Sequence, residues 1–238
     1  MSVVGLAFGL SVAVVPAASA RPKYVAHGWD LLNVSPEEVL QNADAFRRTG
    51  VDGVTLMVRQ KMSDGFLVSF QKGIVDYVWP KDVRQQLQGK VEVLRQIVKR
   101  PGLEESILNV WLSPLKRLSW TNDCAWANFA TNMATAAWMA KAAGLRGWFL
   151  DNEDYRRSRQ YFWDPKADPS FDETLALARR RGREVFGAVF REYPDIVMLA
   201  FWLYMQEMEW GRPVLQDPVA VVRENGRLWP AFLDGIRV

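Results

Sequence analysis

The stretch LRGWFLDNED, residues 145–154, runs from an apolar segment directly into a cluster of carboxylates. Its first half has the composition of a buried strand. Side chains two residues apart on a strand point the same way, about 6.5 to 7 Å apart. Asp151 and Glu153 are therefore expected to project together, with Asn152 and Asp154 on the other side. Two carboxylates that close raise the pKa of one of them, which makes it a usable acid near neutrality.

Strand and helix patterns alternate on both sides of this stretch. Helical spacing, capping boxes and stop signals predict helices over 35–50, 81–100, 124–144 and 170–193, and the opening of another from 229. Strands are expected over 24–30, 52–59, 105–114, 145–154 and 195–204, and a loop over 60–80. Near-continuous apolar strands that alternate with helices indicate an α/β fold with a parallel sheet covered by helices.

The strand ends favour one kind of α/β fold. Polar and aromatic residues follow the strands, as in folds that bind ligands at the carboxyl ends of a parallel sheet. The chain has no glycine-rich phosphate-binding turn, which favours a (β/α)8 TIM barrel over a doubly wound sheet. Only five strands are predicted, whereas a closed barrel has eight. We therefore expect an incomplete barrel that lacks its C-terminal units, with an open five-stranded sheet or a dimerising half-barrel as alternatives.

The N-terminal segment, residues 1–20, has the shape of a secretory signal peptide. An apolar run is followed by Pro16 and the small residues Ala18, Ser19 and Ala20. Cleavage after Ala20 would leave a barrel domain over 21–238 that is secreted or periplasmic and has no membrane span. The run contains no Lys or Arg before its apolar core, and an uncleaved anchor is the alternative.

The amino-acid composition limits the classes of partner and of site that the protein can have. The net charge is only +3, and no nucleic-acid-binding motif accompanies the short basic runs, so no nucleic-acid partner is predicted. Eleven Trp residues suit a surface that is half apolar and half polar, such as a sugar. His27 is the only histidine and Cys124 the only cysteine, which excludes a metal centre built on several histidines and an internal disulfide. We predict no cofactor and no metal, and the oligomeric state stays open.

Four predicted strand exits combine aromatic and polar or acidic residues. Together they predict a carbohydrate site, with substrate contacts from His27, Trp29, Asp30, Trp111, Trp120, Asn152, Asp154, Tyr155, Trp202 and Tyr204. Glu153 and Asp151 are the candidate catalytic residues, because glycoside hydrolysis needs one carboxyl to protonate the leaving oxygen and another to act as nucleophile or base.

The pair Asn152-Glu153, at the end of the fourth predicted strand, resembles that of (β/α)8 glycoside hydrolases, over their first five βα units. This resemblance implies that Glu153 is the acid/base and that Asn152 binds a sugar hydroxyl. Those enzymes keep their nucleophile on the seventh strand, which this sequence does not contain. The flanking Asp151 and Asp154 also resemble an Asp-x-Glu pattern of other barrel hydrolases, some of which use the substrate's acetamido group as nucleophile. Both patterns remain open.

The sequence thus predicts an exported glycoside hydrolase-like protein that acts on a polysaccharide or glycoconjugate. One alternative is a non-catalytic carbohydrate-binding protein on the same barrel. Another is a structural protein whose clustered acids bind Ca²⁺ or Mg²⁺, and the plainest is a solvated turn after a buried strand.

Overall fold

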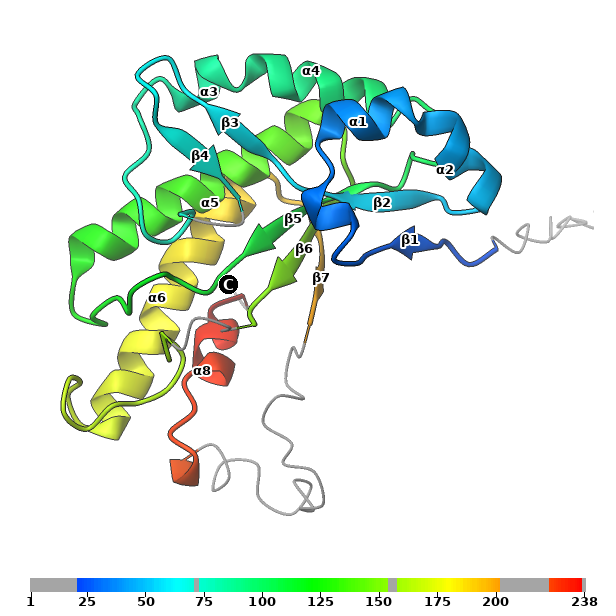
Figure 1. Ribbon diagram of the computed structural model, residues 1–238. Coiled ribbons are helices and arrows are strands. Elements are labelled where there is room, and N and C mark those ends of the chain that lie inside the picture. The colour runs from blue at the N-terminus through cyan, green and yellow to red at the C-terminus, as the bar shows by residue number, and fades with distance from the viewer. Residues whose placement is uncertain (1–20, 71–72, 154–157, 202–222, 237–238) are drawn as a thin grey trace, which may run out of the picture.

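A computed structural model describes residues 21–70, 73–153, 158–201 and 223–236 (Figure 1). Its main sheet contains β1 (Val25–Ala26), β2 (Gly53–Leu56), β5 (Ile107–Trp111), β6 (Gly147–Asp151) and β7 (Val197–Ala200). All four neighbouring pairs are parallel, and the strands lie side by side in chain order. The predicted α/β class with a parallel sheet is confirmed.

The sheet curls into a half-barrel. Its sequential strand order differs from that of a doubly wound sheet, in which the order reverses at one point. The curvature brings His27, which follows β1, against Phe201, which follows β7, with ring centroids 5.1 Å apart. The first and last strands of the half-barrel therefore face each other across its interior.

The helices pack on the outer face of the half-barrel (Figure 1). They are α1 (Pro36–Gln41), α2 (Ala43–Thr49), α3 (Val83–Gln86), α4 (Gln88–Ile97), α5 (Asp123–Ala143), α6 (Phe171–Glu192) and α8 (Trp229–Leu233), with the short 3-10 helix η3 (Asp234–Ile236). Another short 3-10 helix, η1 (Leu31–Asn33), follows β1. Alternate strand residues, among them Leu108, Val110, Trp148 and Leu150, are buried in the core beneath these helices. The other strand residues point into the half-barrel.

Local hydrogen bonds set the helix ends as predicted. Ser35 and Ser170 each form a capping box with the glutamate three residues later, Glu38 and Glu173. Gly144 ends α5 with a φ of 78°, a left-handed conformation that glycine adopts at little cost. The helices predicted over 35–50 and 81–100 are each divided in two, with breaks at Asn42 and Leu87.

The expected loop over 60–80 is partly wrong. An antiparallel hairpin of β3 (Arg59–Lys61) and β4 (Leu67–Ser69) stands at the end of β2. Its turn contains Gly65 at φ 85°, and Asp64 accepts a hydrogen bond from the Phe66 backbone N–H at 2.9 Å. The residues of β3 are polar and mostly exposed. The residue preferences of β-strands largely reflect side-chain burial, so they do not predict an exposed strand of this kind.

The C-terminal elements close on α6 through a backbone contact. A Cβ atom on Gly182 would lie 1.9 Å from the Phe232 carbonyl oxygen, and one on Gly235 would lie 2.2 Å from the Gly182 carbonyl carbon. The helix that was predicted to begin at residue 229 is short and consists of α8 followed by η3, and both pack against α6. Within the described ranges, no helix combines the length and apolarity that a bilayer crossing requires. The predicted signal peptide, 1–20, lies outside those ranges.

Candidate active site

A cavity of about 590 Å³ opens at the carboxyl ends of β1 and β6. Its described lining consists of Val25, His27, Gly28, Trp29, Leu32, Phe149, Asp151, Glu153 and Phe201. Three of these residues carry ionisable side chains, namely His27, Asp151 and Glu153. The cavity is therefore lined mostly by apolar and aromatic residues.

The alternation along β6 places both acids in this cavity. Trp148 and Leu150 pack in the core under the helices, whereas Phe149 and Asp151 face the interior. The Glu153 backbone N–H then donates to the Asp151 side chain at 3.0 Å, which holds the residue after the strand close to its end. The predicted common orientation of Asp151 and Glu153 is confirmed.

Neighbouring residues fix the backbone that carries the two acids. The Trp111 indole N–H donates to the Glu153 carbonyl oxygen at 2.8 Å. The Ser113 hydroxyl donates to the Asn152 carbonyl oxygen at 3.2 Å, and the Leu112 N–H donates to the Asp151 carbonyl oxygen at 2.7 Å. The end of β6 is thus anchored to the end of β5 over three residues, although the pairing of the two strands ends at Asp151.

Burial sets the protonation of Asp151. Its residue surface is only 5% exposed, and loss of solvent raises the pKa of its carboxyl from 3.8 to about 6. The hydrogen bond from the Glu153 N–H opposes this rise, and the negative charge of Glu153 adds to it. The predicted acid with a raised pKa in this pair is therefore Asp151.

His27 is held in the cavity by three contacts. Its Nδ1 lies 3.0 Å from the Thr55 hydroxyl on β2, and its ring stacks on Phe149 with centroids 4.1 Å apart. The edge contact with Phe201 completes the set. Burial lowers the pKa of His27, and the nearby charge of Glu153 opposes that effect. His27 is therefore neutral at pH 7, and its ring forms part of an aromatic wall.

The other predicted substrate contacts divide into two groups. Trp29 lines the cavity and is 61% exposed. Asp30 is exposed in the turn before η1 and is not among the described lining residues. Trp111 is only 7% exposed, and its indole acts on the Glu153 backbone.

Two predicted substrate contacts point elsewhere. Trp120 is fully buried and stacks on Trp126 with centroids 4.9 Å apart, so the prediction that it offers a ring to a sugar is wrong. Asn152 faces the helices. In the orientation that satisfies both amide atoms, it donates to the Phe201 carbonyl oxygen at 3.1 Å and accepts from the Trp229 indole N–H at 3.2 Å. Asn152 is therefore buried outside the cavity, in contrast to the role implied by the resemblance.

Four predicted site residues, Asp154, Tyr155, Trp202 and Tyr204, lie outside the described residues. Sequence reasoning missed Phe149, Phe201 and Leu32 in the cavity wall. For Phe149 the signal was present, because it precedes Asp151 by two residues on the same strand and so shares its face.

Within the described part of the chain, no group of three or more His, Cys, Asp or Glu residues is placed to hold a metal ion. No protein-family model matches the chain, and no curated protein is significantly similar to it. The chemistry of the cavity therefore has to be argued from its own residues.

Proposed function

We propose that this protein is a glycoside hydrolase whose acid is the Asp151–Glu153 pair. One observation carries the proposal: two carboxyls share a cavity at the carboxyl end of a central strand, and the pKa of one of them is raised to about 6. Glycosidic bond cleavage needs a carboxyl that still holds a proton near neutral pH.

The two carboxyls differ in exposure, which divides their roles. Asp151 is nearly fully buried, whereas Glu153 is partly exposed in the cavity. The raised pKa is that of Asp151, and its main cause is burial. In this proposal Glu153, the more exposed carboxyl, donates a proton to the glycosidic oxygen, and Asp151, which keeps its proton to a higher pH, returns a proton to the Glu153 carboxylate. No third carboxyl is found in the described cavity lining, so the proposal covers the acid step alone.

The aromatic wall supports a sugar as the substrate. Trp29 exposes an indole ring, and His27 and Phe149 form a stacked pair beside the acids. Rings of this kind pack on the apolar faces of sugars while neighbouring polar groups bind the hydroxyls. A polysaccharide or glycoconjugate is therefore the substrate class that we infer.

The half-barrel supports a (β/α)8 barrel as the complete architecture. Strands one and five of an eight-stranded cylinder stand opposite each other, as β1 and β7 do in the contact of His27 with Phe201. Three further strands would then close the sheet. The intact mass of the natural protein tests this idea: a mass well above 27.2 kDa is expected, and a mass at or below that value would contradict closure within one chain.

Export through residues 1–20 is also part of the proposal, because this segment ends in the small-residue pattern of a signal peptide. N-terminal sequencing of the natural protein should begin at Arg21. A sequence that begins at or before Met1 would refute cleavage after Ala20.

The decisive test is turnover on a panel of polysaccharides by the full-length natural protein. Glu153→Gln should lower kcat at least about a hundredfold on any substrate that is cleaved, because general acid catalysis contributes that much or more. Glu104→Gln is the matched control, since Glu104 is exposed and its hydrogen bond from the Gly102 N–H can be made by glutamine. Unchanged turnover in Glu153→Gln would refute the proposal.

The exposed ring of Trp29 would equally suit a carbohydrate-binding protein without catalysis. The same variant distinguishes the two functions. In an enzyme, Glu153→Gln should abolish turnover while binding persists, whereas a binding protein should show no turnover with either form.

A further inference from the structure

Asn109, on β5, carries a buried amide whose hydrogen bonds are not made. The residue is only 1% exposed, and neither its side-chain nitrogen nor its side-chain oxygen has a hydrogen-bond partner among the described residues. Both groups lose their hydrogen bonds to water on folding, so an unpaired amide in this place destabilises the folded protein. A buried polar side chain of this kind needs an explanation.

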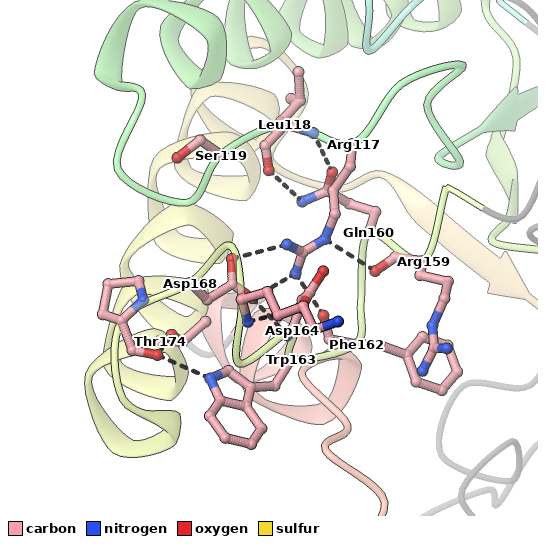
Figure 2. A network of polar contacts seen from close by, with 12 residues as sticks. Arg117, Leu118, Ser119, Arg159, Gln160, Phe162, Trp163, Asp164, Asp168 and Thr174 are labelled. Atoms are coloured by element: carbon pink, nitrogen blue, oxygen red, sulfur yellow. Dashed lines mark hydrogen bonds and ion pairs between the residues drawn. The ribbon is translucent and has the colours of Figure 1, made fainter.

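The other buried amide side chains in the described ranges all have partners. They are Asn132, Asn152 and Gln160. The Asn132 nitrogen donates to two backbone carbonyl oxygens, at 2.9 and 2.7 Å, and both amide atoms of Asn152 are paired as described above. Gln160 exchanges two hydrogen bonds with the Leu118 backbone, at 2.6 and 3.2 Å, beside the contacts of Arg117 with the segment 159–168 (Figure 2). Asn109 is therefore the exception among the buried amides that the structure describes.

The position of Asn109 on β5 directs its side chain toward the candidate active site. Its neighbours Leu108 and Val110 pack in the core under the helices, so Asn109 faces the interior of the half-barrel. Its partner in the register of β5 and β6 is Phe149, and adjacent strands are about 4.8 Å apart. Phe149 lines the active-site cavity. Asn109 therefore lies directly beside a residue of the cavity wall.

The acid pair stands one row above Asn109 on the same face of the sheet. The next interior residue of β5 is Trp111, which pairs in register with Asp151 and donates to the Glu153 carbonyl oxygen. Two residues along a strand correspond to about 6.5 to 7 Å. One sugar unit can span that separation, so a sugar whose bond is held at the acids can present its ring hydroxyls to Asn109.

Phe149 is the side chain that stands between the amide and the cavity. Asn109 is not among the described lining residues, whereas Phe149 is. The Phe149 ring stacks on His27, with centroids 4.1 Å apart, and meets the Phe201 ring edge-on at 4.6 Å. Both partner rings also line the cavity, and Phe149 does not belong to the core under the helices. A ligand in the cavity can therefore turn this ring aside without opening the core.

The chemistry of the amide limits the ligand that would satisfy it. Its nitrogen donates hydrogen bonds and its oxygen accepts them, and a hydroxyl group can do either. Two adjacent hydroxyls of a sugar ring therefore satisfy both atoms at once. A carboxylate or a sulfate would accept from the nitrogen and leave the oxygen unpaired. The amide thus favours an uncharged sugar with two adjacent free hydroxyls.

We propose that Asn109 is a specificity-determining residue, which binds two adjacent hydroxyls of the sugar unit beside the Asp151–Glu153 pair once the Phe149 ring has turned aside. This inference rests on the proposed function and adds a preference for neutral sugar units with adjacent free hydroxyls. The amide makes its hydrogen bonds only in the complex, so a sugar without such a pair leaves it unpaired and binds more weakly.

The test is calorimetric binding of cellohexaose, mannohexaose and laminarihexaose to the full-length natural protein, in a Glu153→Gln background that keeps the sugars intact. The internal units of the first two, which are 1,4-linked, have adjacent free hydroxyls, whereas those of the 1,3-linked laminarihexaose do not. One of the 1,4-linked sugars should bind most tightly. Asn109→Leu should weaken its binding at least about tenfold, because two hydrogen bonds are lost, and should leave the binding of laminarihexaose unchanged.

The melting temperature distinguishes this role from a structural one. Asn109→Leu should keep or raise the melting temperature, because leucine is of similar size and has no unpaired amide. Asn132→Leu is the matched control, since Asn132 is equally buried and its nitrogen is paired. It should lower the melting temperature and leave the affinity for each sugar unchanged.

Several results would overturn the inference. A lower melting temperature of Asn109→Leu would mean that the amide is paired in the free protein, for example by a buried water molecule. An unchanged affinity of that variant, or an equal loss for 1,4-linked and 1,3-linked sugars, would exclude recognition of adjacent hydroxyls. Tightest binding of laminarihexaose, or no binding of any of the three, would do the same.

Turnover separates this inference from the proposed function. If a 1,4-linked hexasaccharide binds through Asn109 and is not cleaved by the natural protein, the glycoside hydrolase proposal fails and the role of Asn109 stands. If a sugar is cleaved in a way that depends on Glu153, and Asn109→Leu changes neither affinity nor rate, the inference fails and the proposed function stands.

Discussion

The substitution Asp151→Asn should stabilise the protein at neutral pH while it impairs the proposed chemistry. Burial raises the pKa of Asp151 from 3.8 to about 6, so the folded state disfavours the charged carboxylate. A difference of that size corresponds to a penalty of up to about 3 kcal/mol once the carboxyl is ionised in both states. Asparagine is uncharged, and its side-chain oxygen can still accept from the Glu153 N–H. The variant therefore escapes the penalty.

The pH dependence follows from the same two values. Well below pH 3.8 the carboxyl is protonated in the folded and the unfolded protein, so it contributes no penalty. Between about 4 and 6 the folded state holds its proton longer than the unfolded state, and the free energy of unfolding falls as the pH rises. Above that window the penalty is complete and constant.

The assay is thermal unfolding of the natural protein and of Asp151→Asn at pH 4 and pH 7.5. The variant should melt about 6 to 12 °C higher at pH 7.5, given about 2 to 4 °C per kcal/mol for a chain of this size. At pH 4 most of the penalty is absent, so the two proteins should differ much less in melting temperature than at pH 7.5. Burial lowers the pKa of His27, but His27 is present in both proteins, so its own contribution largely cancels in the comparison. Equal melting at pH 7.5, or an equal gain at both pH values, would refute the burial argument.

Three further outcomes are expected. Gly182→Ala should lower the free energy of unfolding by about 1 to 3 kcal/mol in denaturant titration, because its Cβ would lie 1.9 Å from a carbonyl oxygen of α8. The control Gly187→Ala, in the same helix, has its nearest neighbour at 3.6 Å and should instead gain up to about 1 kcal/mol; a loss in both would contradict the contact. Trp111→Phe removes the donor to the Glu153 carbonyl oxygen and should lower kcat more than it raises KM in turnover assays, whereas a change in KM alone would argue against a positioning role. Trp29→Ala should raise KM severalfold with little change in melting temperature, since the ring is 61% exposed, and an unchanged KM would exclude it as a sugar platform.

Several features of this protein could be predicted because they depend on near neighbours in the chain. The capping boxes at Ser35 and Ser170 and the left-handed end at Gly144 are formed within a few residues of each other. The common face of Asp151 and Glu153 follows from the two-residue period of a strand. The apolar strands and their alternation with helices were enough to predict a parallel sheet.

Other features depend on residues that are distant in sequence. Trp29 and Trp120 both stand among polar residues, yet one is exposed in a cavity and the other is buried against Trp126. The Asn152 side-chain oxygen accepts a hydrogen bond from the Trp229 indole N–H. Trp229 lies there because α8 packs against α6. No local pattern encodes either outcome, because burial depends on which elements pack together.

The sequence by itself therefore determined the order of elements and the pair of acids, since hydrogen bonds and side-chain alternation act over short distances along the chain. Only the tertiary structure decided which of the two acids is buried. Asp151 is buried because the curvature of the sheet brings residues at the ends of β1, β6 and β7 around one cavity. It likewise decided that Arg117 is joined to the segment 159–168, because packing and not sequence distance brings the two together.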